Sequence, residues 1–386
     1  MKRKRIRGIA MMLALLLMLS VSATAAPLEN PAAQMGEMPC VSALLMDAHT
    51  GEVLFEQNAD EALPPASVTK VMTLLLVMEA LEAGRIALSD MVRVSANAAS
   101  MGGSQVFLEE GEQMSVEEML KCVIIASAND CAVALAEFVA GSEESFVAAM
   151  NTRAAELGMK NTRFENTNGL DDTALRHVSS ARDIAIMSRA LIAHPKILEY
   201  SGIWMDSIRN GAFGLTNTNR LVRFYPGCTG LKTGSTSRAG FCISATAERG
   251  GVSLICVVMG AQTRDIRNAT AAKLLDFGFA NYETFCAEAG ECELPLLGSD
   301  RETLKVSWPA VMLTVPKGSS GRIGATVELP EELAAPIEAG QAVGRVCYTL
   351  DGKEIGCVEI RADAAAGELG FGTLFKELLF QYLILD

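Results

Sequence analysis

The chain has 386 residues, with 46 acidic and 33 basic side chains and a formal net charge of −13 at pH 7. This length exceeds one ordinary hydrophobic core, so we expect two domains and additional segments. The excess of negative charge argues against nucleic-acid binding. Any anionic ligand therefore requires a local group of lysines and arginines.

Residues 1–25 have the pattern of a secretory signal peptide. Basic residues begin the segment, an apolar run follows, and Ala23-Thr24-Ala25 ends it with small side chains. A membrane anchor is the alternative, but the apolar run is short for a membrane span. We therefore expect an exported protein whose mature chain begins at about Ala26 and is still more acidic, because export removes the basic residues at the start.

Residues 41–60 predict a strand, a turn at Thr50-Gly51 and a second strand. Later in the chain, helical periodicity and β-branched runs predict two helices, three strands and a last helix, at residues 145–158, 179–193, 230–236, 240–249, 252–261 and 267–279. Strands at both ends and helices in the middle predict one antiparallel sheet flanked by helices, with a helical insertion.

The segment "PPASVTKVMTLLL" at residues 64–76 places a serine at the start of an almost entirely apolar helix and a lysine one turn further in. Pro64 and Pro65 favour a helix start, and the apolar residues that follow predict a buried helix. Residues three apart lie on the same side of a helix, so Ser67 and Lys70 can meet. A lysine among apolar neighbours loses its charge more readily and can act as a base toward a serine hydroxyl. The alternative is a capping serine with a lysine that extends to solvent.

A second polar group, "ASAND" at residues 126–130, interrupts another predicted helix, which begins at a capping box opened by Ser115. Ser127 and Asn129 lie one residue apart in this kink, so both side chains can point into a cleft. The alternative is an ordinary helix break in which Asp130 caps the next helix.

The strand "LKTGST" at residues 231–236 combines a cation with a residue that has no side chain. Lys232 supplies positive charge, and Gly234 lets a ligand approach the backbone closely. The sequence therefore predicts one strand at which an anionic ligand could bind.

Residues 284–362 consist of short β-branched runs separated by turn residues, which predicts a small all-β domain without a catalytic group. Most of the ten cysteines are irregularly spaced or lie in apolar runs, as core residues do. Cys347 and Cys357 flank a predicted hairpin, but a two-residue turn at Asp351-Gly352 or Gly352-Lys353 would place them on opposite faces, and only a loop of odd length would pair them. With three histidines and no CxxC pattern, we expect no metal site.

The tail, residues 371–386, has an apolar stripe at helical spacing opposite a polar face. It is too short to cross a bilayer but suits a helix that lies in the membrane surface. The alternatives are a helix that docks on its own β-domain or pairs with another copy.

Taken together, S-x-x-K at 67–70, S-x-N at 127–129 and K-T-G at 232–234 resemble the three motifs of the penicillin-recognising serine acyltransferases. The opening hairpin, "NTNGLDD", "HVSSARD", "KTGSTSRAGFC", "LLDFGF", the β-domain and the tail look like those of the low-molecular-mass D-alanyl-D-alanine carboxypeptidases, the serine peptidases that trim bacterial peptidoglycan stem peptides. The resemblance covers nearly the whole mature chain.

The resemblance implies an α+β fold in which an antiparallel sheet is flanked by helices and carries a helical subdomain, as in penicillin-binding proteins and β-lactamases. After the signal peptide at 1–25, we expect this serine acyl-transfer domain at 26–283, a small β-sandwich-like domain at 284–362 and an amphipathic membrane-surface helix at 363–386.

The resemblance also implies how the reaction proceeds. Ser67 would attack the carbonyl between two terminal D-alanines, and Lys70 would take its proton. The backbone N–H groups of Ser67 and Ser235 would hold the oxyanion. Ser127 would pass a proton to the departing D-alanine nitrogen, and Asn129 would hold the substrate amide or orient Lys70.

Lys232, Thr233 and Gly234 would form the wall that binds the free terminal carboxylate, with Arg267 as a second cation. The implied partners are peptidoglycan stem peptides ending in D-Ala-D-Ala, β-lactams as covalent inhibitors, and the membrane surface. No cofactor and no nucleic acid are implied. The implied location is the outer face of the bacterial cytoplasmic membrane.

The chain departs from the family pattern in places. The second motif is S-A-N rather than the S-D-N of class A β-lactamases, and Ser235 follows K-T-G where some members have histidine. Only Glu165, in a predicted turn, could activate a deacylating water as a class A β-lactamase requires, so we expect slow turnover of penicillins.

A β-lactamase or transpeptidase on the same fold and a non-catalytic penicillin or muropeptide sensor are the alternatives. His177 is expected to have a structural hydrogen-bonding role, and Asp183 to cap or brace a helix.

Overall fold

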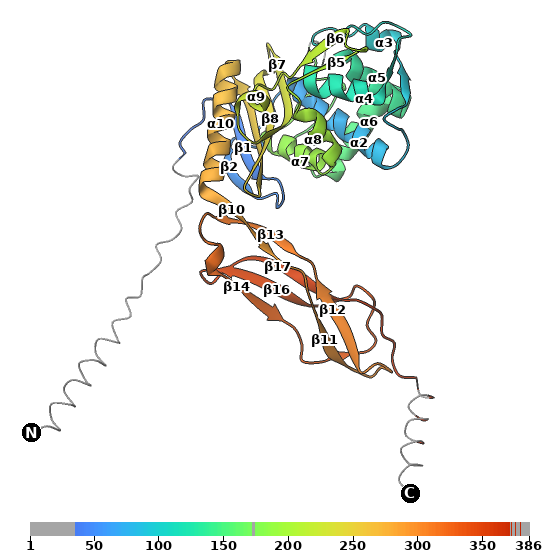
Figure 1. Ribbon diagram of the computed structural model, residues 1–386, viewed down its shortest axis with the longest axis vertical. Helices are drawn as coiled ribbons and strands as arrows, with labels where there is room; N and C mark the ends of the chain where they lie inside the picture. The colour runs from blue at the N-terminus through green and yellow to red at the C-terminus, as the bar shows by residue number, and fades with distance from the viewer. Residues whose placement is uncertain (1–34, 172–173, 371, 373–374, 376–378, 380–386) are drawn as a thin grey trace, which may run out of the picture. The chain divides into compact units, whose positions relative to one another are not determined.

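The computed structural model describes residues 35–171 and 174–370, together with Gly372, Phe375 and Leu379 (Figure 1). The predicted signal peptide lies outside the described residues, and so does most of the predicted tail helix. Among the residues that are described, no helix is both long enough and apolar enough to cross a membrane.

A five-stranded antiparallel sheet organises the chain up to Asn281. Its strand order is β2-β1-β9-β8-β7, so β7, which carries the K-T-G motif, is an edge strand. The strands are β1 (Ser42–Asp47), β2 (Val53–Gln57), β7 (Cys228–Thr236), β8 (Gly240–Arg249) and β9 (Val252–Ala261). This order confirms the antiparallel sheet that the sequence predicts, and it leaves one side of the β7 backbone unused by sheet pairing.

Helices cover both faces of this sheet (Figure 1). Gly278 of α10 (Arg264–Asn281) lies against Leu45 and Leu254 on one face. On the other face, Ser188 of α7 (Ala181–Ile192) has its hydroxyl 2.7 Å from that of Ser244 on β8. Because helices cover both sides, β1, β8 and β9 are buried at consecutive positions rather than at alternate ones.

The helical insertion surrounds α2 (Lys70–Glu82), which is buried over most of its length, as its uniformly apolar sequence predicts. The predicted helices at 145–158 and 179–193 are also present, as α6 and α7. The remaining elements of this region are η2 (Ala66–Thr69), β3 (Met91–Arg93), α3 (Ala96–Ala99), β4 (Gln113–Ser115), α4 (Val116–Lys121), η3 (Cys122–Ala126), α5 (Asn129–Ala140), α6 (Glu143–Glu156), α8 (Pro195–Ser201), β5 (Met205–Ile208), β6 (Phe213–Thr216) and α9 (Leu221–Phe224).

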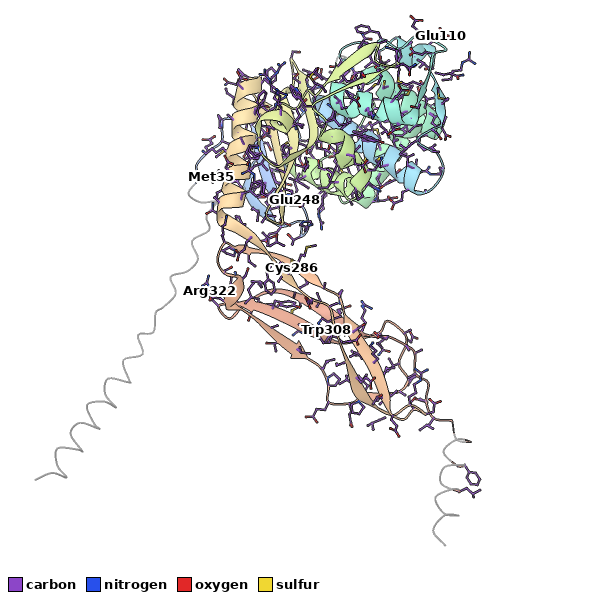
Figure 2. The ribbon with its side chains drawn as sticks, viewed as in Figure 1. Met35, Glu110, Glu248, Cys286, Trp308 and Arg322 are labelled. Atoms are coloured by element: carbon purple, nitrogen blue, oxygen red, sulfur yellow. A yellow bond between two sulfur atoms is a disulfide. The ribbon has the colours of Figure 1, made fainter. Side chains whose placement is uncertain are left out.

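The chain from Tyr282 to Ala362 is built of strands, in agreement with the predicted all-β region. A pair formed by β10 and β13 accompanies a six-stranded sheet of order β14-β16-β17-β12-β11-β15. Figure 2 shows the Trp308 side chain on β12 and Cys286 on β10. The elements are β10 (Tyr282–Ala287), β11 (Gly290–Leu297), β12 (Thr303–Trp308), β13 (Val311–Pro316), η4 (Ser320–Arg322), β14 (Ile323–Glu328), β15 (Leu333–Ala334), β16 (Ala342–Leu350) and β17 (Lys353–Ala362).

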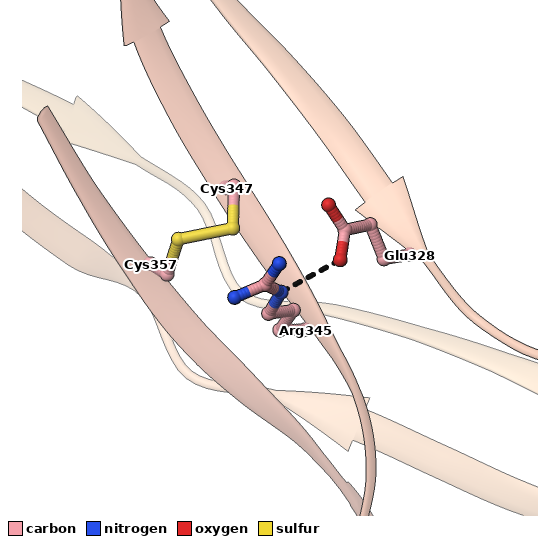
Figure 3. Close-up of a disulfide and its surroundings, with 4 residues drawn as sticks. All are labelled: Glu328, Arg345, Cys347 and Cys357. Carbon is pink, nitrogen blue, oxygen red and sulfur yellow. Dashed lines mark hydrogen bonds and ion pairs between the residues drawn. A yellow bond between two sulfur atoms is a disulfide. The ribbon is translucent and has the colours of Figure 1, made fainter. Parts of the chain in front are cut away.

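Cys347 and Cys357 form a disulfide across β16 and β17, which corrects the expectation that a two-residue turn would separate them (Figure 3). The turn does have two residues, because Leu350 pairs with Lys353. A bulge beside Tyr348 then adds one residue to β17, so Cys347 lies opposite Cys357. The two cysteines would lie on opposite faces only if the register were uninterrupted, and the bulge interrupts it.

The disulfide is expected to stabilise this sheet. Replacing both cysteines, as in Cys347→Ala/Cys357→Ala, releases a loop closed at a sequence separation of 10 and should lower the free energy of unfolding by about 2–3 kcal/mol. Urea unfolding of the variant and of the oxidised parent measures the difference. Equal midpoints with equal slopes would contradict the prediction.

Candidate active site

A cleft of about 440 Å³ brings the predicted residues together from distant parts of the chain. Its walls come from η2, from the η3–α5 junction, from the edge strand β7 and from the start of α10. The lining residues are Ser67, Ser104, Ser127, Trp204, Thr216, Asn217, Thr218, Arg220, Thr233, Gly234, Ser235, Phe241, Arg264 and Arg267. Six of the nine predicted site residues therefore face the cleft, and the other three lie directly behind it.

Ser67 lies in a short 3₁₀ turn, η2, and not in the first turn of the α-helix as the sequence suggested. Ala66 enters this turn with a positive φ of 48°. Its carbonyl oxygen accepts a hydrogen bond from the Thr69 hydroxyl at 2.8 Å. A Cβ on Gly169 would approach the same oxygen to 1.9 Å, so only glycine fits there. These contacts fix the backbone that presents Ser67.

The Lys70 amine is fully buried among three oxygen atoms. Nζ lies 2.8 Å from Oγ of Ser67, 2.5 Å from Oδ1 of Asn129 and 2.8 Å from the main-chain oxygen of Asn168. An amide oxygen and a main-chain oxygen can only accept hydrogen bonds. A neutral amine would therefore donate its two N–H groups to them and direct its lone pair at the Ser67 hydroxyl.

Two effects favour the neutral form of this amine. Burial, followed by the positive charge of Lys232, lowers the pKa of Lys70 well below its ordinary value, and Asp130 opposes part of this shift. The sequence predicted that Ser67 and Lys70 meet. It did not predict the contact of Lys70 with Asn168, because every residue has a main-chain oxygen and the residue type does not show which one is used.

Ser127 itself has a left-handed backbone conformation, which positions its side chain. The helix that begins at Ser115 widens into the π-helix η3, and Ser127 then has φ 65°. Its Oγ lies 2.8 Å from Nζ of Lys232 on β7, and Lys232 also donates to the main-chain oxygen of Thr233 at 2.9 Å. The predicted kink is thus confirmed, and Ser127 and Asn129 each contact one of the two buried lysines.

The β7 wall combines close approach with positive charge. A Cβ on Gly234 would come within 2.7 Å of the Ser67 nitrogen, so this glycine lets the edge strand pass directly beside the serine. The Thr233 hydroxyl donates to that of Thr218 at 2.8 Å, and Ser235 is exposed to the cleft. Burial, followed by the charge of Arg267, lowers the pKa of Lys232 to about 7.

Arg267 is buried on α10 at the cleft wall. Its guanidinium donates to Oδ1 of the neighbouring Asn268, at 2.9 Å and 3.1 Å, and to the oxygen of Cys242 at 3.4 Å. These partners carry no charge, so the positive charge of the guanidinium is not neutralised by them.

A loop that sequence reasoning missed holds Asn129 in place. The Asn129 side chain donates to the main-chain oxygen of Gly102 at 2.6 Å, which directs its Oδ1 at Lys70. The Asn129 backbone donates to the oxygen of Ser104 at 2.7 Å. Gly103 between them has a positive φ of 75°, and a Cβ there would lie 2.8 Å from the Asn129 amide nitrogen.

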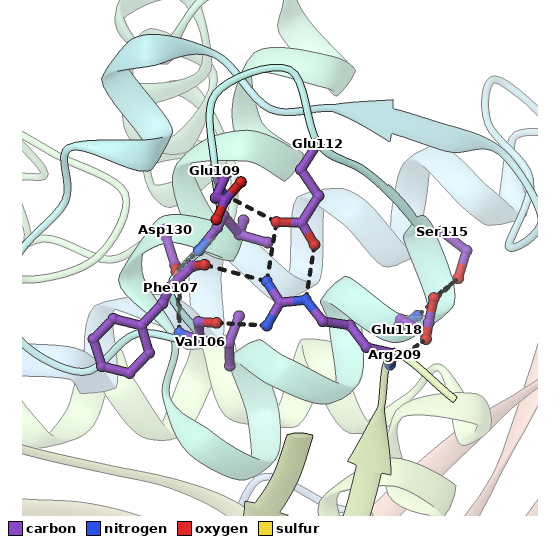
Figure 4. A network of polar contacts seen from close by, with 9 residues as sticks. Val106, Phe107, Glu109, Glu112, Ser115, Glu118, Asp130 and Arg209 are labelled. Carbon is purple, nitrogen blue, oxygen red and sulfur yellow. Dashed lines mark hydrogen bonds and ion pairs between the residues drawn. The ribbon is translucent and has the colours of Figure 1, made fainter. Parts of the chain in front are cut away.

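An ion pair and hydrogen bonds to a buried carboxylate hold the far end of the same loop (Figure 4). Arg209 donates to both carboxylate oxygens of Glu112, at 2.8 Å and 3.0 Å, and to the main-chain oxygen of Val106. The buried carboxylate of Asp130 accepts the N–H groups of Val106 and Leu108. Asp130 therefore anchors the loop. The alternative in which Asp130 caps the next helix does not hold, because α5 begins one residue before it.

His177 has the structural role that was expected. Its Nδ1 accepts the N–H of Glu165 at 3.0 Å, so its Nε2 carries the proton and donates to the Thr69 hydroxyl at 2.7 Å. Asp183 was expected to cap or brace a helix, but it lies in the first turn of α7, which Ser180 caps. Its carboxylate instead holds a loop, because it accepts hydrogen bonds from the Asn161 backbone and the Thr162 hydroxyl.

The arrangement was compared with known proteins. A family model described as D-alanyl-D-alanine carboxypeptidase matches residues 29–263, and one described as penicillin-binding protein 5, C-terminal domain, matches residues 295–368. The D-alanyl-D-alanine carboxypeptidase DacF of Bacillus subtilis is 42% identical over 355 residues, which cover 88% of either chain.

Two solved structures are also similar. Penicillin-binding protein 5 from Haemophilus influenzae matches with a TM-score of 0.78 and 35% identity, over 86% of this chain and 98% of that one. Penicillin-binding protein D2 from Listeria monocytogenes, in its ampicillin-bound form, matches with a TM-score of 0.58 and 33% identity, over 63% of this chain and 98% of that one.

Burial of His177 predicts a distinct pH dependence of stability. Burial lowers the pKa of this imidazole to about 4, so below pH 6.5 the unfolded chain takes up the proton first. The contribution of neutral His177 to the free energy of unfolding is complete above about pH 6.5. It decreases by roughly 3 kcal/mol as the pH falls to about 4. The His177→Gln variant lacks this titration, and urea unfolding between pH 7 and pH 4 should give a smaller loss than in the parent. Parallel curves would refute the assignment.

Proposed function

The chain belongs to the D-alanyl-D-alanine carboxypeptidase family of serine hydrolases, and from that premise we propose that it works through an acyl-enzyme on Ser67. The observation that carries this proposal is the contact of Ser67 with a buried Lys70 whose other two partners are acceptors only. The substrate is a peptidoglycan stem peptide ending in D-Ala-D-Ala, from which the last D-alanine is removed.

In the acylation step, Oγ of Ser67 attacks the carbonyl carbon of the penultimate D-alanine while Nζ of Lys70 takes the hydroxyl proton. The resulting oxyanion is held by the N–H groups of Ser67 and Ser235. The approach of Gly234 to the Ser67 nitrogen supports this pair of donors, since it brings the two backbones together. Loss of one such donor typically lowers the rate about 10²- to 10³-fold.

The C–N bond then breaks as the departing amine receives a proton from Ser127. Lys232, 2.8 Å away, stabilises the oxygen of Ser127 until Lys70 returns the proton to it. Asn129 keeps the Lys70 amine in place throughout. In deacylation, water attacks the ester, Lys70 accepts its proton, and the proton is returned to Ser67 as the ester bond breaks.

The terminal carboxylate binds to Lys232, Thr233 and Ser235, with Arg267 as a further cation and Gly234 as the point of close approach. Lys232 and Arg267 are buried, so an anion that reaches them meets charges that water screens poorly. This pocket supplies the local positive charge that an acidic chain needs in order to bind an anion.

The position of Glu165 favours a carboxypeptidase over a β-lactamase. Its carboxylate accepts the N–H of Arg176 at 3.0 Å and lies 3.5 Å from the Arg163 guanidinium. A carboxylate engaged there does not serve as a base for deacylation, so penicillins are expected to acylate Ser67 and leave slowly. The ampicillin-bound form of the Listeria relative supports acylation by β-lactams.

We further propose export by the signal peptide at 1–25, a catalytic domain at 26–283, a β-domain at 284–362 and attachment of the helix at 363–386 to the outer face of the cytoplasmic membrane. The amphipathic pattern of the tail and the extracytoplasmic substrate of the family support this location.

The proposal is tested by incubating the purified mature protein with a peptide ending in D-Ala-D-Ala and measuring free D-alanine. Release is expected from the parent and not from Ser67→Ala, and a penicillin adduct should appear by intact mass only in the parent. An adduct without release would indicate a sensor or a transpeptidase without its acceptor. A Lys70→Met variant that acylates at the parent rate would overturn the role of Lys70.

Substrate affinity should depend on pH through Lys232. Its pKa of about 7 in the free enzyme means that the ammonium is lost as the pH rises through 7, whereas a bound carboxylate requires it. KM should therefore rise above pH 7, by at most about tenfold per pH unit. Steady-state kinetics between pH 6 and pH 9 check this, and Lys232→Arg, which keeps its charge, should show little change. A KM that is constant in the parent would contradict the prediction.

A further inference from the structure

The segment from Thr216 to Arg220 forms one wall of the cleft, and we call it the cleft rail. The rail residues that line the cleft are Thr216, Asn217, Thr218 and Arg220. Asn217 and Asn219 are buried, whereas Thr216 and Arg220 are exposed. The rail continues from β6 and turns at Arg220, where the backbone has a helical φ of −63°.

The two buried asparagines hold the rail rigidly. Asn217 donates to the main-chain oxygens of Ser201 and Ile203, at 3.0 Å and 2.8 Å. Asn219 donates to the oxygen of Gly230 at 2.7 Å, and its own Oδ1 accepts the N–H of Leu221 at 3.1 Å. Buried amides with satisfied hydrogen bonds fix a backbone well. The position of Arg220 is thus set by the fold.

The rail lies on the side of the cleft where the leaving group would bind. The Thr218 hydroxyl receives the hydrogen bond of the Thr233 hydroxyl at 2.8 Å, and Thr233 belongs to the wall proposed for the terminal carboxylate. Arg220 follows two residues later on the same rail. Arg264 approaches from α10, one turn before Arg267.

Arg220 and Arg264 are charges without counterions. Both side chains are exposed to the cleft, and neither has a hydrogen bond or an ion pair with any residue in the described part of the chain. None of the described residues that line the cleft is acidic. The repulsion between Arg264 and Arg267 also contributes to a pKa of Arg267 near 10, after the larger effect of burial. In a chain with net charge −13, such a group of cations is stabilised when an anion binds.

One carboxylate does not use all of these cations. Lys232, Thr233, Ser235 and Arg267 suffice for the terminal carboxylate, which leaves Arg220 and Arg264 free for a second anionic group. We propose that Arg220 and Arg264 form a second anion subsite, and that the enzyme also hydrolyses D-Ala–X bonds whose leaving residue X carries a second carboxylate. This inference rests on the proposed function.

The chemistry is the same hydrolysis. The acyl group passes to Ser67 and then to the hydroxyl of water, and residue X leaves as a free amine with both of its carboxylates. Residue X is a terminal D-amino acid with an acidic side chain, so the leaving group has two carboxylates.

The first test compares peptides with the same acyl part that end in D-Ala-D-Glu and D-Ala-D-Gln. The two side chains have nearly the same shape and differ in charge. A charge-assisted hydrogen bond is stronger than a neutral one, and the partly open cleft weakens it through solvent screening, so kcat/KM should be about tenfold higher for the D-Glu peptide. Arg220→Gln and Arg264→Gln should each bring the ratio of kcat/KM for the D-Glu peptide to that for the D-Gln peptide closer to one. The exposed Arg301→Gln, outside the cleft, should leave it unchanged.

A kcat/KM ratio near one for the D-Glu and D-Gln peptides in the parent would overturn the inference, and so would a ratio that neither arginine variant changes. If no peptide is hydrolysed, the proposed function has failed, and the subsite is then tested by competition. The D-Glu peptide should protect Ser67 from a penicillin at about tenfold lower concentration than the D-Gln peptide does. Equal protection would overturn the subsite independently of catalysis.

Discussion

The Lys70 amine lies where three segments of the chain meet, and much of the surrounding structure depends on keeping it there. Ser67 reaches it from η2, Asn129 from the start of α5 and Asn168 from the loop before α7. An uncompensated buried ammonium is costly, so the site favours a neutral amine with its lone pair on the serine. The positive φ of Ala66 and the π-helix η3 are local distortions that bring these groups to one point.

A layer of residues behind the cleft keeps this geometry without touching the reacting atoms. The loop that follows Gly102 orients the Asn129 amide, and Arg209 with Glu112 fastens the far end of that loop. On the other side, His177 holds the Thr69 hydroxyl, which in turn bonds the carbonyl that precedes Ser67. Positioning of this kind matters because hydrogen-bond energies fall steeply as the geometry worsens.

The charges of the cleft contrast with those of the whole chain. After the larger effect of burial, the charge of Lys232 lowers the pKa of Lys70, and the charge of Arg267 lowers the pKa of Lys232. Arg264 likewise lowers the pKa of Arg267, and Arg220 adds positive charge at the rim. The same clustering has two consequences. It favours a neutral base beside Ser67, and it makes the remaining cations bind an anion, so base and carboxylate pocket arise from one electrostatic arrangement.

Local pattern was enough for much of this protein. The apolar run after Ser67 determined a buried helix, and the spacing of three residues determined that Lys70 meets the serine, because both depend only on helix geometry. The three motifs, in order, indicated the family. The order of strands and helices likewise indicated an antiparallel sheet covered by helices.

Only the tertiary structure decided which distant groups complete the site. Asn168 contributes a main-chain oxygen, Arg209 acts through a loop about a hundred residues away, and Asp130 anchors that loop rather than capping its helix. The Cys347–Cys357 disulfide depended on a bulge that shifts the register by one residue. No local sequence pattern predicts contacts of backbone atoms, long-range ion pairs or strand register, because each is set by the packing of segments that are far apart in the chain.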